Sequence, residues 1–221
     1  DGSFWMDEAA QALESSRPFS QQLMIAEDFQ PPLFHLIVHA LTYLSSQEWW
    51  HRTASLTASV ITSVFVYLIA RKLKLNTFAQ LIAPLFMITS SFDIFYAQEL
   101  RPYALSSMFA VMSWYFLIQS TQHKNRAQSL YFVGFTLATV GGMYSTYLYP
   151  FLAVSQLAYI FFFHRTTLIK TMLSFCMTAL LYLPWLPSLY TQLQVGQLLR
   201  EKTINWGAVV GTPILKALPL V

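Results

Sequence analysis

The sequence has few charged residues: 10% of its 221 residues are Asp, Glu, Lys or Arg, against roughly 25% in an average soluble domain. Hydrophobic residues make up 55% of the chain and aromatic residues 16%. So few charged side chains cannot cover a soluble core of this size, which excludes an ordinary soluble globule and a disordered chain. Only seven glycines are present, which excludes a collagen-like chain. The single cysteine, Cys176, excludes an internal disulfide.

Long apolar stretches are abundant instead. A membrane span needs about 20 mostly apolar residues, and five stretches of the chain reach that length. The fourth is too long for one crossing, and we divide it at the polar turn that begins at Gly141-Gly142. The sequence thus predicts an all-α polytopic membrane protein with six transmembrane spans and short loops in residues 53–207, followed by a truncated further span at 208–221. The six spans are 53–70, 78–97, 102–120, 129–147, 148–163 and 168–190.

The first 52 residues form the predicted outer loop. Within it, the segment 31–44 is apolar but too short to span, and it opens with two prolines. We interpret it as a helix that lies in the membrane interface. His35 and His39 are spaced four residues apart, as metal ligands on a helix can be. No Glu stands in the position that a zinc protease motif would need, so a structural role for both is the favoured interpretation, and we predict no metal site.

The placement of charge supports this count of spans independently. Three predicted links, 71–74, 123–126 and 164–170, hold seven of the 13 basic residues and none of the ten acidic ones. By the positive-inside rule these links are cytoplasmic. The acidic residues then lie outside the membrane, on the non-cytoplasmic side, or near the outer membrane interface. The chain begins without a Met and ends within an apolar run, so we expect it to be part of a longer membrane protein.

Two polar stretches on the outer side are candidates for chemistry. The first contains Asp7 and Glu8, whose ordinary interpretation is the solvated first turn of a helix. The second contains Glu99 and Arg101 in a short loop between two spans. Ionisable residues at membrane depth are functional candidates, and a guanidinium binds phosphate through two oxygens at once. The alternative is a loop ion pair without further function.

Other functional classes find little support. Arg52 opens the first span, where a snorkelling anchor is the simple interpretation. The sequence has no glycine-rich phosphate loop and no dinucleotide-binding fingerprint. It also has no basic face interleaved with base-stacking aromatic residues, so we expect no nucleic-acid partner.

The order of these motifs is similar to that of a known family. Asp7-Glu8, then Asp28 followed by Pro31-Pro32-Leu33, then Arg52, then the segment from Tyr96 to Tyr103 (YAQELRPY) resembles the GT-C glycosyltransferases of the family 39 type. That family includes protein O-mannosyltransferases and the aminoarabinose transferase of lipid A. The resemblance covers about residues 5–110. It departs from the family at Gln30, where many members have His.

The resemblance implies a GT-C-like helix bundle with an outer juxtamembrane helix. It also implies transfer of a sugar, with inversion, from a polyprenyl-phosphate donor to an acceptor hydroxyl at the outer face. Asp7 would be the catalytic base, and Arg101 would stabilise the leaving phosphate. The remaining substrate-binding residues implied are Glu8, Arg52, Gln98, Glu99 and Tyr103. For Glu99 three roles stay open: to orient Arg101, to bind a sugar hydroxyl or to help hold a divalent cation.

The expected partners are the lipid-linked donor, membrane lipids and a lipid, glycan or protein acceptor. The sequence requires no cofactor, although a divalent cation is compatible with it. The protein is expected in the plasma (inner) membrane if the source is prokaryotic, with its active site on the non-cytoplasmic side. Two alternatives remain. A transporter or flippase would need polar or broken helices near the bilayer midplane, for which Pro84 and Gly141-Gly142 are the hints. A structural subunit would need no active site.

Overall fold

The computed structural model describes residues 6–23 and 29–203, and these residues form helices and connecting turns with no strand among them. This confirms the all-α fold class. The elements are α1 (Met6–Ser15), α2 (Phe19–Gln22), α3 (Leu33–Thr42), α4 (Glu48–Lys72), α5 (Thr77–Ile88), α6 (Ser91–Gln98), α7 (Tyr103–Gln122), α8 (Asn125–Met143), α9 (Tyr149–Phe163), η1 (Arg165–Thr167), α10 (Leu168–Tyr182), η2 (Leu183–Trp185) and α11 (Leu186–Thr203).

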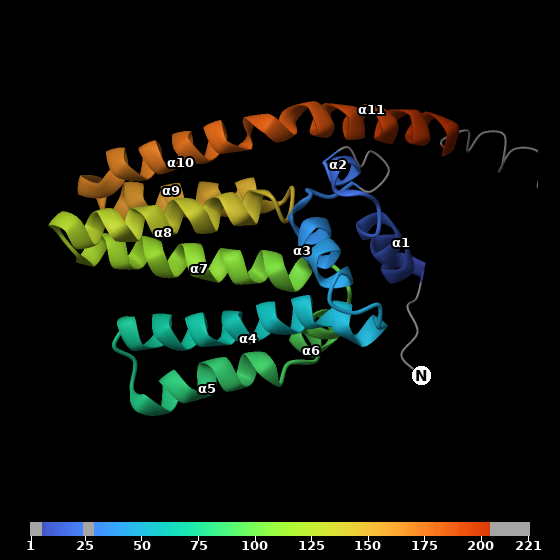
Figure 1. Cartoon of the computed structure of the whole chain (residues 1–221). Coiled ribbons are helices and arrows are strands. Elements are labelled where there is room, and N and C mark those ends of the chain that lie inside the picture. The colour runs from blue at the N-terminus through green and yellow to red at the C-terminus, as the bar shows by residue number, and fades with distance from the viewer. Residues whose placement is uncertain (1–5, 24–28, 204–221) are drawn as a thin grey trace, which may run out of the picture.

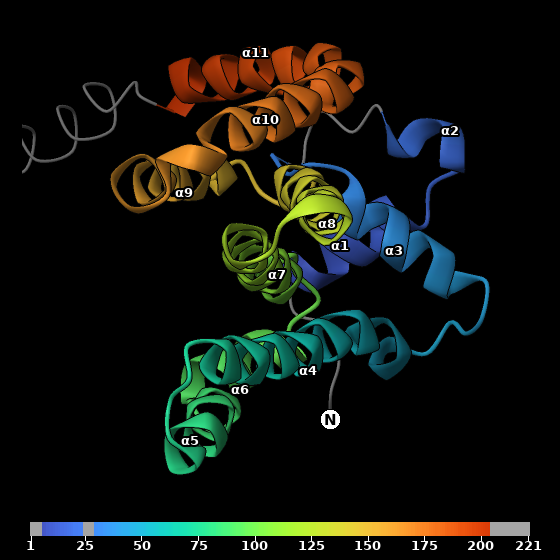
Figure 2. The same ribbon diagram turned by 90° about the vertical axis from the view of Figure 1, so that its left-hand side faces the viewer.

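The long helices lie side by side in one bundle, and α1, α2 and α3 gather at one end of it (Figure 1). Viewed along the bundle, α7 and α8 occupy the centre, with α4 and α5 on one side and α10 on the other (Figure 2). We call the end with α1–α3 and the turns 98–103 and 144–148 the acidic end. The opposite end, with the links α4–α5, α7–α8 and α9–α10, is the basic end. The predicted separation of charge therefore corresponds to the two ends of the bundle.

Two helical runs among the described residues are long and apolar enough to cross a membrane, Glu48–Lys72 and Arg165–Gln197. A third is added if the bent pair α5 and α6 counts as one span. These helices support an integral membrane protein. The predicted number of six spans is not tested by this criterion, and the truncated span predicted at 208–221 lies outside the described residues.

The stretch 78–97, predicted as one span, is a broken helix. The axes of α5 and α6 differ by 53°. Pro84 lies inside α5 and does not end it; the break follows at Thr89 and Ser90. There the Thr89 hydroxyl donates to the carbonyl of Leu85, and the Ser90 hydroxyl accepts from the backbone N–H of Asp93 as an N-cap. Polar side chains thus satisfy backbone groups that the break leaves open.

Gly141 and Gly142 belong to the last turn of α8, and the polar turn expected from the sequence follows them at residues 144–148, where it separates α8 from α9. Neither glycine has a positive φ. Their role is close packing: a Cβ on Gly142 would lie 1.8 Å from the ring of Tyr149, and a Cβ on Gly141 would lie 2.4 Å from the ring of Phe109. The absence of side chains lets α7 and α9 approach this turn of α8.

Gly142→Ala is therefore expected to destabilise the protein by about 1–3 kcal/mol, the usual cost of overpacking a close contact. Thermal unfolding of the purified protein in detergent measures the effect. Gly196→Ala is the control, since the nearest atom to its added Cβ is Phe29 Cε1 at 3.1 Å, the edge of a ring on an exposed side chain. Equal melting temperatures for Gly142→Ala and the wild type would contradict the packing argument.

A hydrophobic core lies under the acidic end. Phe34 and Val38 of α3 pack with Leu100, Leu105 and Met108. The backbone N–H of Leu33 also donates to the carbonyl of Tyr144, 3.0 Å away, in the turn between α8 and α9. The helix α3 occupies the segment predicted to lie in the interface, and these contacts fix it against the ends of α7 and α8.

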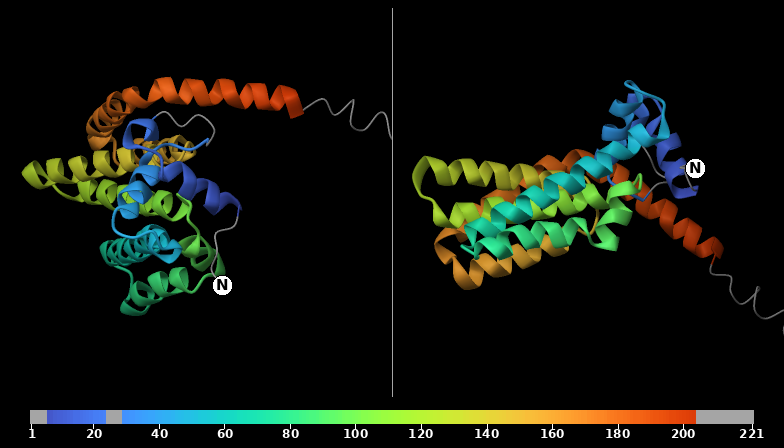
Figure 3. Two further views of the ribbon diagram at one scale, coloured as in Figure 1. Left: turned by 45° about the vertical axis from the view of Figure 1, so that its right-hand side comes forward. Right: turned by 90° about the horizontal axis from the view of Figure 1, so that it is seen from below.

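The last long helical run continues beyond the bundle. The expected span ended at Tyr190, but the structure continues through η2 into α11, which ends at Thr203. Pro184 lies in η2 and Pro187 in the first turn of α11, where a missing backbone N–H costs no intrahelical hydrogen bond. Figure 3 shows α11 extending past the acidic end of the bundle.

Candidate functional site at the acidic end

Glu8 is the best-anchored acidic residue at this end. Its side chain is 1% exposed, and its carboxylate accepts from both Nε (3.0 Å) and Nη2 (2.6 Å) of Arg52. The same carboxylate accepts from the backbone N–H of Leu100 at 2.8 Å. Glu8 therefore joins α1, the beginning of α4 and the turn between α6 and α7. A buried carboxylate needs such partners, because an isolated one would be strongly disfavoured.

Asp7 and Arg101 form a second ion pair beside the first. Arg101 Nη2 lies 3.2 Å from Asp7 Oδ2, and the Asp7 side chain is 69% exposed whereas that of Arg101 is 13% exposed. The structure thus brings together the predicted base and the predicted phosphate ligand, which are far apart in sequence. An ion pair as exposed as this one on the Asp7 side contributes about 0–1 kcal/mol, so it can open at little cost.

Glu99 directly precedes Leu100 and Arg101 in the chain and is half-buried. Its Oε2 atom is buried, and no described residue forms a hydrogen bond with it. Burial raises the pKa of Glu99 above its ordinary value, although the positive charge of Arg101 opposes this shift and the carboxylates of Glu8 and Asp7 add to it. The site therefore contains one carboxyl group that binds a proton more tightly than usual.

This shift predicts a pH dependence of stability. Because the folded state binds the Glu99 proton more tightly than the unfolded state, stability falls as the pH rises from the ordinary glutamate pKa through the raised one. Glu99→Gln is expected to remove that decrease and to leave the protein at least as stable at neutral pH. Unfolding followed between pH 4 and pH 8 (about the range spanned by shifted carboxyls) measures it. Lower stability of Glu99→Gln at neutral pH would contradict the prediction.

The other predicted residues of this loop are more exposed. Gln98 is exposed and ends α6. Tyr103 begins α7, is 48% exposed and packs edge-on against Tyr96 with ring centroids 4.8 Å apart. Gln98 and Tyr103 therefore lie near Glu99 and Arg101 because they are close to them in the sequence. Substrate contacts for the predicted site residues stay predictions.

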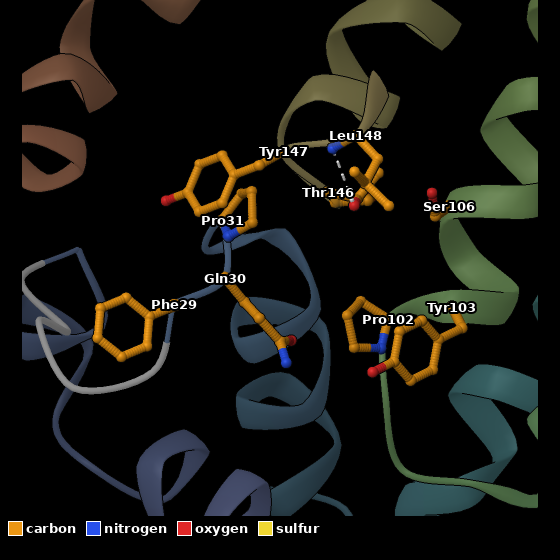
Figure 4. Close-up of a pocket in the computed structure, with 10 residues that line it drawn as sticks. Phe29, Gln30, Pro31, Pro102, Tyr103, Ser106, Thr146, Tyr147 and Leu148 are labelled. Carbon is orange, nitrogen blue, oxygen red and sulfur yellow. Dashed lines mark hydrogen bonds between the residues drawn. The ribbon is translucent and has the colours of Figure 1, made fainter. Parts of the chain in front are cut away.

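A cavity of mixed polarity adjoins the loop that carries Glu99 and Arg101 (Figure 4), and we call it the polar cavity because it is less apolar than its neighbour. It has a volume of about 250 Å³ and is lined by Phe29, Gln30, Pro31, Pro102, Tyr103, Ser106, Ser145, Thr146, Tyr147 and Leu148. Pro102 and Tyr103 directly follow Arg101 in the chain. The Gln30 side chain extends between Phe29 and Pro102 in Figure 4, and its Oε1 is buried without a partner among the described residues. A buried amide oxygen without a hydrogen-bond partner is unusual in a folded protein.

An apolar cavity of about 430 Å³ lies next to it. The two cavities share Phe29, Thr146 and Tyr147, and the apolar one is completed by Met143, Pro150, Tyr182, Leu189, Gln192 and Leu193. At the shared wall the Tyr147 hydroxyl donates to Gln192 Oε1 and accepts from Trp185 Nε1 at 3.1 Å. Gln192 also donates to the carbonyl of Gln30. Tyr147 thus connects the α8–α9 turn to α11 where the polar and apolar cavities meet.

Sequence reasoning did not find Gln30, Ser106, Tyr147 or Gln192 as lining residues. Tyr147 belongs to none of the motifs found in the sequence, and its spacing from Gln192 carries no motif. The one available signal was Gln30, which replaces the His that many family members have before Pro-Pro-Leu.

The two histidines of α3 have protein partners. His35 Nδ1 lies 2.7 Å from Gln11 Nε2, and His39 Nδ1 lies 2.8 Å from the carbonyl of Ser15. Both pairs attach α3 to α1. Within residues 6–23 and 29–203, no group of three or more His, Cys, Asp or Glu could hold a metal ion.

An apolar helix bundle with clustered ion pairs and two cavities at one end defines the chain as a polytopic membrane protein with a candidate site at one membrane face. The family of dolichyl-phosphate-mannose-protein mannosyltransferases matches residues 29–190. The chain belongs to this family, a GT-C type, as the motifs had indicated. No curated protein and no solved structure matches it.

Membership makes the chain a membrane glycosyltransferase of a family that uses polyprenyl-phosphate-linked sugar donors. It is therefore an integral membrane protein that binds such a donor and an acceptor. The break between α5 and α6 is a feature that a transporter would also need, but the family match favours transfer. Residues 1–28, which include Asp7 and Glu8, lie outside the matched range.

Proposed function

We propose that the protein transfers a hexosyl or pentosyl group from a polyprenyl-phosphate donor to an acceptor hydroxyl at the non-cytoplasmic face, with inversion. The observation that carries this proposal is the juxtaposition of two adjoining cavities, one polar and one apolar, with the loop of Glu99 and Arg101. A lipid-linked sugar likewise has a polar part, the sugar, and an apolar part, the lipid chain. The non-cytoplasmic face is supported by the basic links at the opposite end of the bundle.

The donor's isoprenoid units suit the apolar cavity, whose walls include Met143, Pro150 and Leu193. Burying apolar surface there is favourable by roughly 25 cal/mol per Å². The sugar suits the polar cavity, where Gln30 can accept from a hydroxyl. Tyr147, at the shared wall, would then lie beside the junction of lipid and phosphate.

In the reaction, the acceptor oxygen attacks the anomeric carbon, the bond from that carbon to the phosphate oxygen breaks, and the phosphate leaves with the bonding electrons. Asp7 takes the proton of the acceptor hydroxyl. Arg101 stabilises the charge that develops on the leaving phosphate. For inversion the acceptor and the phosphate lie on opposite faces of the sugar, which requires the base and the phosphate ligand to be separated by the ring.

The 3.2 Å contact between Asp7 and Arg101 leaves no room for a sugar ring between them. The ion pair is therefore the resting arrangement. When the donor binds, its phosphate takes the place of Asp7 on Arg101, and the freed carboxylate turns to the acceptor. Glu8 and Arg52 pair with each other, and Glu8 also accepts from the backbone N–H of Leu100. We therefore assign Glu8 and Arg52 the role of positioning Asp7 and the Glu99–Arg101 loop.

Transfer of radiolabelled sugar from polyprenyl-phosphate donors tests the proposal. Membranes containing the full-length protein are expected to move label from the lipid fraction into an acceptor fraction, whereas membranes without it are not. Release of label on the non-cytoplasmic side of sealed vesicles checks the face. Uptake of a polar solute into the vesicles, with no transfer from any donor offered, would contradict the proposal and favour a transporter.

A further inference from the structure

A second apolar groove begins near the basic end of the bundle and extends to Leu181, whose carbonyl accepts from the Tyr144 hydroxyl. It runs between α8 and α10, which pack against each other, and has a volume of about 440 Å³. Figure 2 shows these two helices neighbouring each other when the bundle is viewed from the basic end. The groove is lined by Ser129, Phe132, Val133, Thr136 and Leu137 of α8 and by Lys170, Leu173, Ser174, Met177 and Leu181 of α10.

The groove has a closed floor and open apolar walls. Phe132 and Ser174 are each 7% exposed and form the floor. Val133, Leu137 and Leu173 are 56%, 62% and 62% exposed and stand along the rim. In a membrane protein, exposed apolar walls of this kind can bind an apolar chain that lies between them.

The polar residues of the groove mark one end of it. Lys170 and Ser129 lie in the first turns of their helices, at the basic end. Arg126 precedes Ser129 by three residues and so lies on the same face of α8, one turn further out. Lys170 Nζ donates to Gln128 Oε1, a neutral amide. The sequence contains no Asp or Glu between Arg101 and Arg200, so neighbouring segments supply no carboxylate to this cationic end.

The length of the groove matches one leaflet of a bilayer. From Lys170 to Leu181 the helix rises about 16 Å, at 1.5 Å per residue. The hydrocarbon core of a bilayer is about 30 Å thick. The groove is therefore about as long as one leaflet of the hydrocarbon core is thick, which is the length of one acyl chain.

We propose that this groove binds an anionic phospholipid, with one acyl chain along α8 and α10 and the headgroup phosphate at Lys170 and Arg126. Positive charge at the mouth of an apolar groove is complementary to an anionic headgroup joined to a hydrocarbon chain. The residues proposed to bind the headgroup, Lys170 and Arg126, lie at the opposite end of the bundle from Glu99 and Arg101.

Native mass spectrometry of the full-length protein, purified in detergent and offered phosphatidylglycerol or phosphatidylcholine, tests the proposal. The wild type is expected to retain phosphatidylglycerol preferentially. Lys170→Gln with Arg126→Gln is expected to weaken that retention by about fivefold for each charge removed, while phosphatidylcholine retention stays the same. Lys74→Gln, a basic residue of the α4–α5 link at the same end, is the matched control and is expected to behave as the wild type.

Two further variants keep the test decisive if the double variant fails to fold. Lys170→Arg retains the charge and is expected to keep the preference. Ser174→Phe fills the floor and is expected to reduce retention of both lipids. Equal retention of the two lipids by the wild type would overturn the proposal. Unchanged preference in the Gln double variant would do so as well, and would indicate that the charge selectivity arises elsewhere on the protein.

Discussion

Replacing Asp7 with asparagine is expected to lower sugar transfer by about 10²- to 10⁴-fold, the usual contribution of a positioned general base. The amide keeps the size of the side chain but cannot take the proton of the acceptor hydroxyl. Protein levels and melting temperature are expected to stay close to the wild type, because Asp7 is 69% exposed and its ion pair with Arg101 contributes little stability. Rates of transfer from the labelled donor, at matched protein levels, measure the effect.

A matched control lies on the same helix. Glu14 also forms an ion pair, with Arg17 at 2.7 Å, but it lies two turns further along α1. Glu14→Gln is expected to keep transfer within a fewfold of the wild type. If Asp7→Asn retains full activity, Asp7 is not the base, and Glu99 becomes the next carboxylate to test. Loss of activity in both α1 variants would indicate a shared structural cause.

The second large effect is expected at Glu8. Glu8 is buried, whereas the Arg52 side chain that the variant leaves behind is 23% exposed, so Glu8→Ala is expected to destabilise the protein by about 1–3 kcal/mol, the cost of leaving hydrogen-bond donors without their acceptor. The variant leaves Arg52 without its carboxylate and also leaves the N–H of Leu100 without its acceptor. The melting temperature in detergent measures the loss, and transfer is expected to fall with it because the Glu99–Arg101 loop is no longer fixed to α1.

The double variant Glu8→Leu with Arg52→Met separates charge from packing. It removes both charges, so it is expected to recover part of the stability that Glu8→Ala loses, without recovering transfer. Arg17→Ala is the control and is expected to cost less, since the side chain that it removes is 39% exposed, although that of its partner Glu14 is 11% exposed. Equal melting temperatures for Glu8→Ala and Arg17→Ala would contradict the positioning role of Glu8.

The class of the protein was predictable because it depends on local patterns. The length of apolar stretches indicates helices in lipid, and the basic links indicate one end of a bundle. The motifs around Asp7 and from Tyr96 to Tyr103 indicated the family, which the match over residues 29–190 confirms. None of these signals requires knowledge of which helices touch.

Local detail was predicted less well where the backbone departs from a simple helix. Pro84 was the visible hint of a broken span, yet the break lies at Thr89 and Ser90, where hydroxyl groups cap the free ends. Gly141 and Gly142 suggested a turn, but they are helical and make room for Phe109 and Tyr149. In both cases a side chain's environment, and not its intrinsic preference, determines its role.

The membrane class, the helical fold, the family and a short set of candidate charges follow from the amino-acid sequence. The pairing of those charges depends on the fold: Glu8 pairs with Arg52 and Leu100, and Asp7 pairs with Arg101. It also decided that Tyr147 and Gln192 meet between two cavities. The physical reason is that burial and ion pairing depend on helices that pack together, so a buried carboxylate and an exposed one look the same when they are neighbours in a sequence.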